Sequence, residues 1–208
     1  MGKKSFVYKS ALIYILGLKI LHKKNFDKRY RFMASFAKTG DTVLEPACGP
    51  AILEEYLVDG ASYCGFDTNE IFIDYGLKKK RNVFLGNVLN KKDYRPADVV
   101  AVCDVLHHLK SSDRGHFVEH CYRSAKKTLI ICEPFRRNGF FERLMLPYRK
   151  FLFSIIEKDG TNCPKLTEGY TRDELFSEIN NGFGVIPSAA QRTINEIGDD
   201  LIAVYQKS

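Results

Sequence analysis

A loop of small residues that follows an apolar run is the part of the sequence best suited to bind a ligand. Thr42-Val-Leu-Glu-Pro-Ala-Cys-Gly-Pro-Ala51 holds an apolar run, an acid at Glu45 and then small side chains, which let a ligand approach the backbone closely. A second acid, Asp67, lies 22 positions after Glu45. An acid about 20 residues beyond such a loop suits the two hydroxyls of a ribose. We therefore expect a nucleoside-containing cofactor.

The elements that must position these acids alternate along the chain. After Gly40, strands are predicted at 42–46, 62–66, 82–86, 97–103 and 127–133, with helices at about 51–58, 69–79 and 112–125. Strands that alternate with helical segments indicate βαβ units and a parallel sheet. In an open sheet of this kind ligands bind at the carboxyl ends of the strands, and both acids end a predicted strand.

The C-terminal third departs from this alternation. From Phe135 to about Tyr170 the regular pattern lapses, and residues 140–156 are apolar and basic. A helix is predicted to begin after Thr171, since Glu174 completes a capping box. Two last strands are predicted near 184–194 and 201–206, joined by a hairpin turn at Ile197-Gly-Asp-Asp200.

Composition limits the class of protein. A chain of 208 residues with 45% hydrophobic and 27% charged residues suits one soluble globular domain. The six cysteines show no CxxC spacing, which argues against a zinc site and a disulfide framework. We therefore expect no metal, buried reduced thiols and a reducing, cytoplasmic compartment.

The net charge of +7 is concentrated at the N-terminus. Residues 1–40 hold ten Lys or Arg and one acid, a net charge of +9, whereas the remaining 168 residues carry −2. Within this arm, residues 10–21 are densely apolar but too short for a membrane span, and no signal-peptide cleavage site follows. A helix that is apolar on most faces must be buried. We expect it to pack over the mouth of the site, or alternatively to lie on an anionic membrane surface.

Four motifs occur in order: Val43-Leu-Glu-Pro-Ala-Cys-Gly-Pro-Ala51, Gly65-Phe-Asp67, Gly86-Asn87 and residues 98–109, which end in Val-Leu-His-His-Leu. Together they resemble class I S-adenosylmethionine-dependent methyltransferases, in the small-molecule branch related to ubiquinone-biosynthesis enzymes. The resemblance covers about residues 35–208. It implies a Rossmann-like α/β fold: a seven-stranded, mostly parallel sheet with an antiparallel C-terminal hairpin strand, helices on both faces and an N-terminal helical lid.

The resemblance also implies a domain organisation and a cofactor. Residues 1–40 would form the basic and apolar lid, and 41–208 the methyltransferase domain, with the insert 135–170 joining the substrate lid. The cofactor would be S-adenosylmethionine. The residues expected to bind it are Glu45, Ala47, Cys48, Gly49, Asp67, Thr68, Asn69, Asn87, Val88, Cys103 and Asp104.

Individual roles follow from the same resemblance. Glu45 would orient the loop or meet the cofactor's amino group through water, and Asp67 would hold the ribose hydroxyls. His107 and His108 are the candidate general bases for an acceptor that must lose a proton. Asp104 and Tyr170 are expected to face the same mouth.

The sequence departs from the family pattern at three positions. Ala47 and Ala51 stand where the family loop usually has glycine, so we expect negative φ angles at both. Asn87 stands where an Asp is common, so a hydrogen bond from adenine would lose its charge assistance.

The acceptor is expected to be a small, apolar molecule such as a lipid-like compound, because residues 6–21 and 140–156 are unusually apolar. The methyl group would be transferred to its oxygen or carbon. A dinucleotide enzyme is disfavoured since G-x-G-x-x-G is absent. Two alternatives remain: an inactive methyltransferase-like binding protein and an RNA methyltransferase. Nucleic acid is not the expected partner, because the Asn/Asp-Pro-Pro-aromatic loop of base-methylating enzymes is absent.

Overall fold

The computed structural model of the chain describes residues 5–136 and 169–207. Most of the predicted insert 135–170 therefore lies outside the described residues, including the apolar and basic segment 140–156. The cysteines of the described part, Cys48, Cys64, Cys103, Cys121 and Cys132, are all free thiols, as expected.

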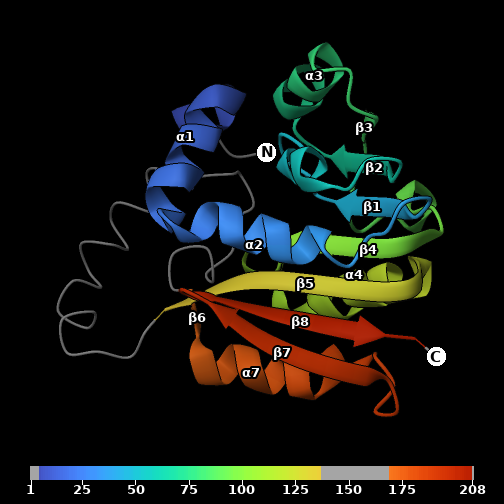
Figure 1. Cartoon of the computed structure of the whole chain (residues 1–208). Helices are drawn as coiled ribbons and strands as arrows, with labels where there is room; N and C mark the ends of the chain where they lie inside the picture. The colour runs from blue at the N-terminus through green and yellow to red at the C-terminus, as the bar shows by residue number, and fades with distance from the viewer. Residues whose placement is uncertain (1–4, 137–168, 208) are drawn as a thin grey trace, which may run out of the picture.

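One mixed sheet forms the centre of the structure (Figure 1). Its strands are β1 (Thr42–Pro46), β2 (Ser62–Asp67), β3 (Val83–Leu85), β4 (Ala97–Cys103), β5 (Ala125–Arg136), β6 (Tyr170–Thr171), β7 (Gln191–Ile197) and β8 (Asp200–Gln206). Their order is β3-β2-β1-β4-β5-β8-β7, and the two-residue β6 pairs with the end of β5. Strands β1 to β5 pair in parallel, whereas β8 is antiparallel to both β5 and β7. The predicted Rossmann-like α/β fold is thus confirmed, with β6 as an additional short strand.

Helices cover both faces of this sheet. The α-helices are α1 (Ala11–His22), α2 (Asn25–Ala34), α3 (Glu70–Lys78), α4 (Ser111–Ser124) and α7 (Arg172–Asn180). Short 3-10 helices are η1 (Phe6–Lys9), η2 (Ile52–Tyr56), η3 (Lys91–Asp93), η4 (Leu106–His108) and η5 (Gly182–Gly184).

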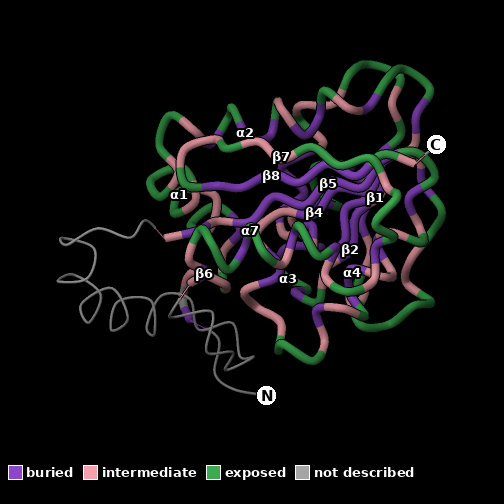
Figure 2. Tube along the Cα trace, turned by 90° about the horizontal axis from the view of Figure 1, so that it is seen from below, coloured by how far each residue is buried: buried purple, intermediate pink, exposed green. Residues whose placement is uncertain are grey.

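The core consists of two layers separated by the sheet. Helix α2 packs Phe26 and Met33 on one face, together with Ile130 of β5. Helices α4 and α7 pack on the other face, where Phe117 and Leu175 are fully buried. The central strands are accordingly buried along most of their length, whereas the helices expose their outer sides (Figure 2). This burial on both faces explains the near-continuous apolar runs of β4 and β5.

Local sequence signals predict some boundaries of helices and strands correctly and others incorrectly. The capping box at Thr171 and Glu174 starts α7 as predicted. The expected strand 184–194 begins only at Gln191, because Gly182 and Gly184 have positive φ angles and form η5 instead. The expected helix at 51–58 is the shorter 3-10 helix η2.

The loop after β1 corrects one expectation. Ala47, Gly49 and Ala51 have φ angles of 54°, 52° and 58°, so both alanines are left-handed and the expected negative φ angles are wrong. The chain must turn sharply here, since the Cys48 N–H bonds to the Phe66 carbonyl and the Ala51 N–H bonds back to the Cys48 carbonyl. A left-handed alanine costs roughly 1–2 kcal/mol, which the surrounding packing has to offset.

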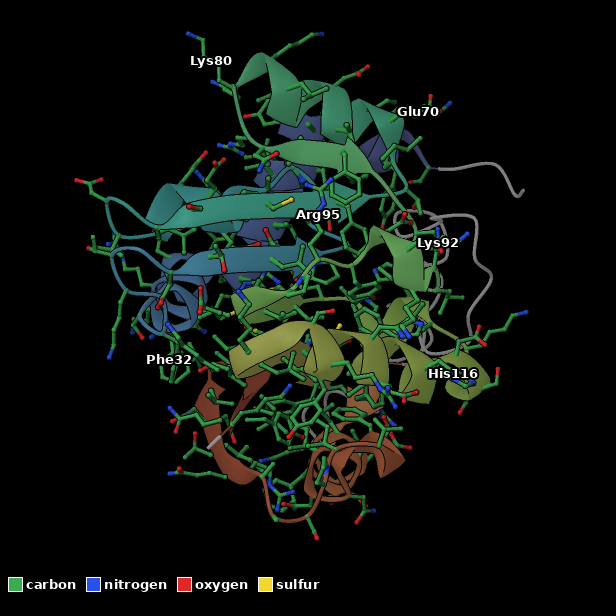
Figure 3. All side chains as sticks on the ribbon, turned by 90° about the vertical axis from the view of Figure 1, so that its right-hand side faces the viewer. Phe32, Glu70, Lys80, Lys92, Arg95 and His116 are labelled. Atoms are coloured by element: carbon green, nitrogen blue, oxygen red, sulfur yellow. The ribbon has the colours of Figure 1, made fainter. Side chains whose placement is uncertain are left out.

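Charged and polar side chains cover the outer surface of the molecule (Figure 3). Exposed examples are Lys80 after α3, Lys92 in η3 and His116 on α4. Within residues 5–136 and 169–207, no helix has the length and apolar character needed to cross a bilayer.

Gly65 provides a test of how closely the loop packs on β2. A Cβ at this position would lie 2.6 Å from the Tyr63 hydroxyl oxygen and 2.8 Å from the Cys48 side chain. We expect Gly65→Ala to lower the free energy of unfolding by about 1–3 kcal/mol, measured by urea denaturation, because the loop must shift.

Gly17 is the matched control, because a Cβ there meets no atom within 4 Å. Gly17→Ala should raise the free energy of unfolding by about 0.5–1 kcal/mol, since alanine is favoured in a helix interior. Equal effects of the two substitutions would contradict the packing described here.

Candidate functional site

A cavity of about 330 Å³ lies at the carboxyl ends of β1 to β4. It is lined by Tyr8, Tyr14, Ala47, Gly49, Asp67, Thr68, Asn69, Phe72, Asn87, Val88, Leu89, Cys103, Asp104, Val105, His108 and Leu109. All the residues expected to bind a cofactor are in this set except two. Glu45 and Cys48 are buried and do not line the cavity. The other residues predicted from the sequence to bind a cofactor thus lie together around one cavity.

Asp67 ties the loop after β1 to the end of β2. Its Oδ2 accepts a hydrogen bond of 2.9 Å from the Gly49 N–H, and its Oδ1 accepts one of 2.8 Å from the Asn69 N–H. Asp67 also lines the cavity, so its carboxylate lies beside the space that a ligand would occupy. Asp67 therefore shapes the cavity and can also bind within it.

Glu45 of β1 is buried and does not reach the cavity. Its carboxyl group is buried and accepts a hydrogen bond from the Tyr63 hydroxyl. Burial raises the pKa of Glu45 to about 8, although the hydrogen bond from Tyr63 acts in the opposite direction. Glu45 is thus a largely neutral acid beneath the loop, and it supports the loop from below.

Asn87 follows β3 and is already engaged within its own loop. Its Oδ1 accepts a hydrogen bond of 2.9 Å from the Leu89 N–H, and its own N–H donates to Asp93 Oδ2 at 2.8 Å. Its amide carbonyl therefore has one remaining lone pair for a ligand donor. Asn87 is an exposed residue and lines the cavity.

The N-terminal segment supplies an aromatic wall that the sequence did not reveal. The rings of Tyr14 and Phe72 lie 4.8 Å apart, and the Tyr8 ring lies 5.5 Å from that of Tyr14. Asn69 Nδ2 fastens this wall to α3 by a 3.0 Å hydrogen bond to the Tyr8 carbonyl. The cavity is therefore closed on one side by η1 and α1.

Asp104 is held by a buried ion pair with Arg29 of α2. The two guanidinium nitrogens lie 3.0 and 2.8 Å from the two carboxylate oxygens, and Arg29 is fully buried. Burial by itself would raise the pKa of Asp104, but Arg29 and then His22 outweigh burial and hold it at about 2. Asp104 is consequently ionised and engaged on both oxygens, which excludes it as a general base near neutral pH.

A second pairing orients one of the two histidines. Glu133, at the end of β5 and fully buried, accepts hydrogen bonds from the backbone N–H groups of Val105, Leu106 and His107 at 3.0–3.1 Å. Its Oε1 also bonds the His107 ring at Nδ1. A carboxylate at Nδ1 favours the tautomer with the proton on Nδ1. His107 itself is not among the residues that line the cavity.

His108 and Tyr170 differ in their access to the cavity. His108 lines it, with its ring centre 4.2 Å from that of His107. Tyr170 is fully buried on β6 and does not line it, so the expectation that it faces the mouth is wrong. Its position follows from β6, a strand that the sequence did not predict.

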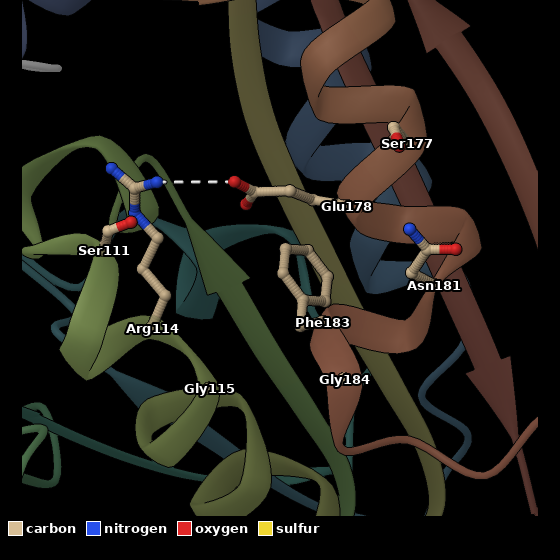
Figure 4. Close-up of a pocket in the computed structure, with 8 residues that line it drawn as sticks. All are labelled: Ser111, Arg114, Gly115, Ser177, Glu178, Asn181, Phe183 and Gly184. Carbon is tan, nitrogen blue, oxygen red and sulfur yellow. Dashed lines mark hydrogen bonds and ion pairs between the residues drawn. The ribbon is translucent and has the colours of Figure 1, made fainter.

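Arg114 of α4 fixes the turn that carries both histidines. Its Nε donates to the carbonyls of Leu106 and Leu109 at 3.2 Å each, and its Nη1 lies 3.4 Å from Glu178 of α7. A second cavity, of about 370 Å³, opens beside this pair between α4 and α7 (Figure 4). None of the residues that line this second cavity belongs to the loop after β1.

The described residues contain one group of donors close enough to hold a metal ion: His22, Asp104 and Asp200. Arg29 Nη1 lies 3.7 Å from Asp200 Oδ1 and also binds Asp104 Oδ1, while Nη2 binds Asp104 Oδ2. A guanidinium in this position supplies the positive charge that a metal would otherwise bring. The group is therefore described as an ion-pair cluster around Arg29.

Two residues of this site, Glu133 and Arg29, were not predicted from the sequence. Glu133 follows the apolar run of β5, as Asp67 ends β2, so its position at a strand end was an available signal. Arg29 lies in a helix with several exposed basic residues and had no distinguishing signal. Its burial depends on how α2 packs against the sheet.

Comparison with known proteins agrees with this fold. A protein-family model described as mitochondrial small ribosomal subunit Rsm22 matches residues 66–166, just under half of the chain. None of the curated proteins matches this chain in sequence.

Several solved structures are similar to the chain. An O-methyltransferase family protein from Burkholderia thailandensis has a TM-score of 0.64 at 13% identity, covering 95% of this chain and 59% of that protein. Magnesium protoporphyrin IX methyltransferase from Synechocystis PCC 6803, with bound SAH, has a TM-score of 0.61 at 17% identity, covering 100% and 90%. Human N-acetylserotonin methyltransferase, in complex with SAM, has a TM-score of 0.63 at 14% identity, covering 97% and 58%.

This chain thus spans less than two thirds of the first and third of these proteins. At such identities the likeness concerns the fold, and the chain has the fold of class I S-adenosylmethionine-dependent methyltransferases.

The Arg29–Asp104 pair predicts a strong effect of a single substitution. Arg29→Gln leaves Asp104 and Asp200 buried without their cation, and should lower the free energy of unfolding by about 3–5 kcal/mol in urea. Lys28→Gln, at an exposed position of the same helix, should change it by less than about 0.5 kcal/mol. An equally small effect at both positions would contradict a structural role for the pair.

The same pair predicts a dependence of stability on pH. The pKa of Asp104 is about 2 in the folded protein, below its ordinary value of 3.8. The contribution of the ion pair to the free energy of unfolding is therefore present above pH 3.8 and is lost as the pH falls toward 2. In denaturation curves over this range, the difference in stability between the wild type and Arg29→Gln should shrink; a constant difference would show that Asp104 does not titrate as described.

Proposed function

We propose that the chain transfers a methyl group from S-adenosylmethionine to a small, apolar acceptor, on oxygen or carbon. The observation that carries the proposal is the cavity at the strand ends, where the loop after β1, Asp67 and His108 meet in a methyltransferase fold. Its volume of about 330 Å³ lies within the usual range of small-molecule sites, roughly 300–1,000 Å³.

The residues present fit this cofactor. Asp67 places a carboxylate, a strong acceptor for ribose hydroxyls, in the lining of the cavity. The small residues Ala47 and Gly49 allow close approach to the backbone. Asn87 and Val88 stand at the edge where an adenine would lie. When bound, the cofactor supplies an activated methyl group, so the protein mainly has to align the acceptor and exclude water.

For an oxygen acceptor, His107 is the proposed general base. Glu133 binds its ring at Nδ1, and this contact sets the tautomer and the orientation of the ring. Arg114 and the backbone bonds to Glu133 hold the turn, which keeps the ring orientation constant. A carbon acceptor that is already nucleophilic would not need this base.

The character of the acceptor and the place of the reaction are also proposals. Residues 1–40 would cover the mouth of the domain formed by 41–208, and the insert 135–170 would complete the cover. Tyr8, Tyr14 and Phe72 give the cavity an aromatic wall, which favours an apolar, lipid-like acceptor. The free thiols of the described part favour a cytoplasmic location.

One observation favours a second candidate, a function on RNA. The family model that matches residues 66–166 is named for a ribosomal subunit protein, and residues 1–40 carry a net charge of +9. RNA binding by this arm would weaken steeply with salt. Copurifying RNA, together with a steep salt dependence of its affinity, would favour this candidate over a small acceptor.

Calorimetric titration with S-adenosylmethionine tests the cofactor. The wild type should bind, and Asp67→Ala should weaken binding at least about tenfold because a charge-assisted hydrogen bond is lost. Asp74→Ala removes an exposed carboxylate on α3 and should leave affinity unchanged. No binding by the wild type at millimolar cofactor would contradict the proposal and favour an inactive binding protein.

Substitution of the two histidines separates their roles. With an oxygen acceptor, His107→Asn should lower kcat by about 10²–10⁴-fold, the usual contribution of a general base, while leaving S-adenosylmethionine affinity unchanged. Glu133→Gln should lower kcat through the changed ring orientation. If His108→Asn alone abolished turnover, the base would be His108.

A further inference from the structure

Helix α1 exposes an apolar face to solvent. Leu12, Leu16 and Ile20 are 66%, 58% and 65% exposed, and Ile13 and Leu21 lie beside them at 44% and 51%. The positions 12, 16 and 20 repeat every four residues and form one stripe about 12 Å long. Since Ala11 is the one fully buried residue of α1, the expectation that this helix is buried is wrong for most of its surface.

The opposite side of α1 belongs to the cavity. Tyr14 lines it, and Ile15 and Leu18 pack against the core cluster that contains α2. Figure 1 shows α1 on the side of the sheet to which the arrows of β1 and β2 point. The helix is therefore a wall with the cavity on one side and an exposed apolar stripe on the other.

The surroundings of the stripe are basic. Exposed lysines flank it in η1, in α1 and in the turn that follows: Lys9, Lys19, Lys23, Lys24 and, on α2, Lys28. Helix α1 contains no acidic residue, and residues 1–40 hold a single acid. Such a combination of apolar stripe and lysines is complementary to lipid chains below anionic headgroups.

A protein partner would need an apolar groove to receive the stripe and acidic residues to pair with the lysines. An anionic bilayer offers both along its whole surface. Helix α1 has 12 residues, and no described helix is long enough to span a membrane, so the helix would lie in the interface and not cross it.

We infer that the exposed face of α1 docks the protein on an anionic membrane surface. The apolar residues Leu12, Leu16 and Ile20 enter the headgroup region, and the flanking lysines pair with anionic lipid. This position brings the aromatic wall of Tyr8 and Tyr14 to the bilayer. For the proposed function, on which this step rests, an apolar acceptor would then reach the cavity without crossing water.

Flotation of the full chain with vesicles tests the docking surface. The probes are vesicles of phosphatidylcholine alone and of phosphatidylcholine with about 30% phosphatidylserine. At low salt the protein should float with the anionic vesicles, and its partitioning should fall at least about tenfold on neutral vesicles or at high salt. Absence of flotation with anionic vesicles at low salt would overturn the inference.

Two double variants identify the surface. Leu16→Glu with Ile20→Glu should reduce partitioning at least about tenfold, because two apolar side chains become anionic. Val58→Glu with Leu77→Glu adds the same charge at exposed apolar positions outside α1 and should retain most of the binding. Equal loss in both variants would mean that net charge alone, and not the α1 stripe, governs binding.

Two further measurements separate this inference from its rivals. If the wild type is dimeric by light scattering, Leu16→Glu with Ile20→Glu makes it monomeric, and no vesicle binding occurs, then α1 is an interface between copies and the inference is wrong. Calorimetry with S-adenosylmethionine on the same variant should give wild-type affinity. Vesicle binding without cofactor binding would overturn the proposed function but leave the docking surface intact.

Discussion

The buried ion pair between Arg29 and Asp104 is the interaction on which the site depends. Asp104 follows β4 with a left-handed φ of 59°, and its N–H bonds to the Cys132 carbonyl of the neighbouring strand. Its carboxylate then reaches α2, where Arg29 binds both oxygens. This one contact joins the sheet to the N-terminal helices, and it thereby fixes the wall that α1 forms beside the cavity. A neutral pair of the same shape would not balance Asp200, which also lies against Arg29.

The carboxyl edge of this parallel sheet gathers several acidic side chains in one place. Acids follow or end four strands at one edge: Glu45, Asp67, Asp104 and Glu133. Four free carboxylates at this edge would repel one another in a site of low polarity. Each of the four carboxyl groups therefore has a different partner, and the partner determines its protonation and its role in the site.

Glu45 is buried with Tyr63, and its pKa is raised to about 8. Asp67 and Glu133 accept backbone N–H groups, and Asp104 pairs with Arg29. Among the four, Asp67 and Asp104 line the cavity, whereas Glu133 acts on His107. The division of roles thus arises from the partners, because the four side chains are chemically alike.

The sequence predicted the elements near the site well because their signals are local. The strand β1, the acid Asp67 and the capping box of α7 each depend on a few neighbouring residues. The left-handed geometry of Ala47 and Ala51 could not be predicted, since a turn imposed by packing outweighed the local preference of alanine. Likewise, the burial of Arg29 and the exposure of α1 depend on how distant segments pack.

Hydrogen–deuterium exchange with and without S-adenosylhomocysteine tests the central claim, that the cavity at the strand ends binds the cofactor. The account predicts slower exchange of backbone amides in three segments that line this cavity: residues 47–49, 67–69 and 87–89. Amides of α7 and η5, beside the cavity between α4 and α7, should exchange at unchanged rates. Protection confined to α7 and η5, or no protection at saturating ligand, would contradict the account.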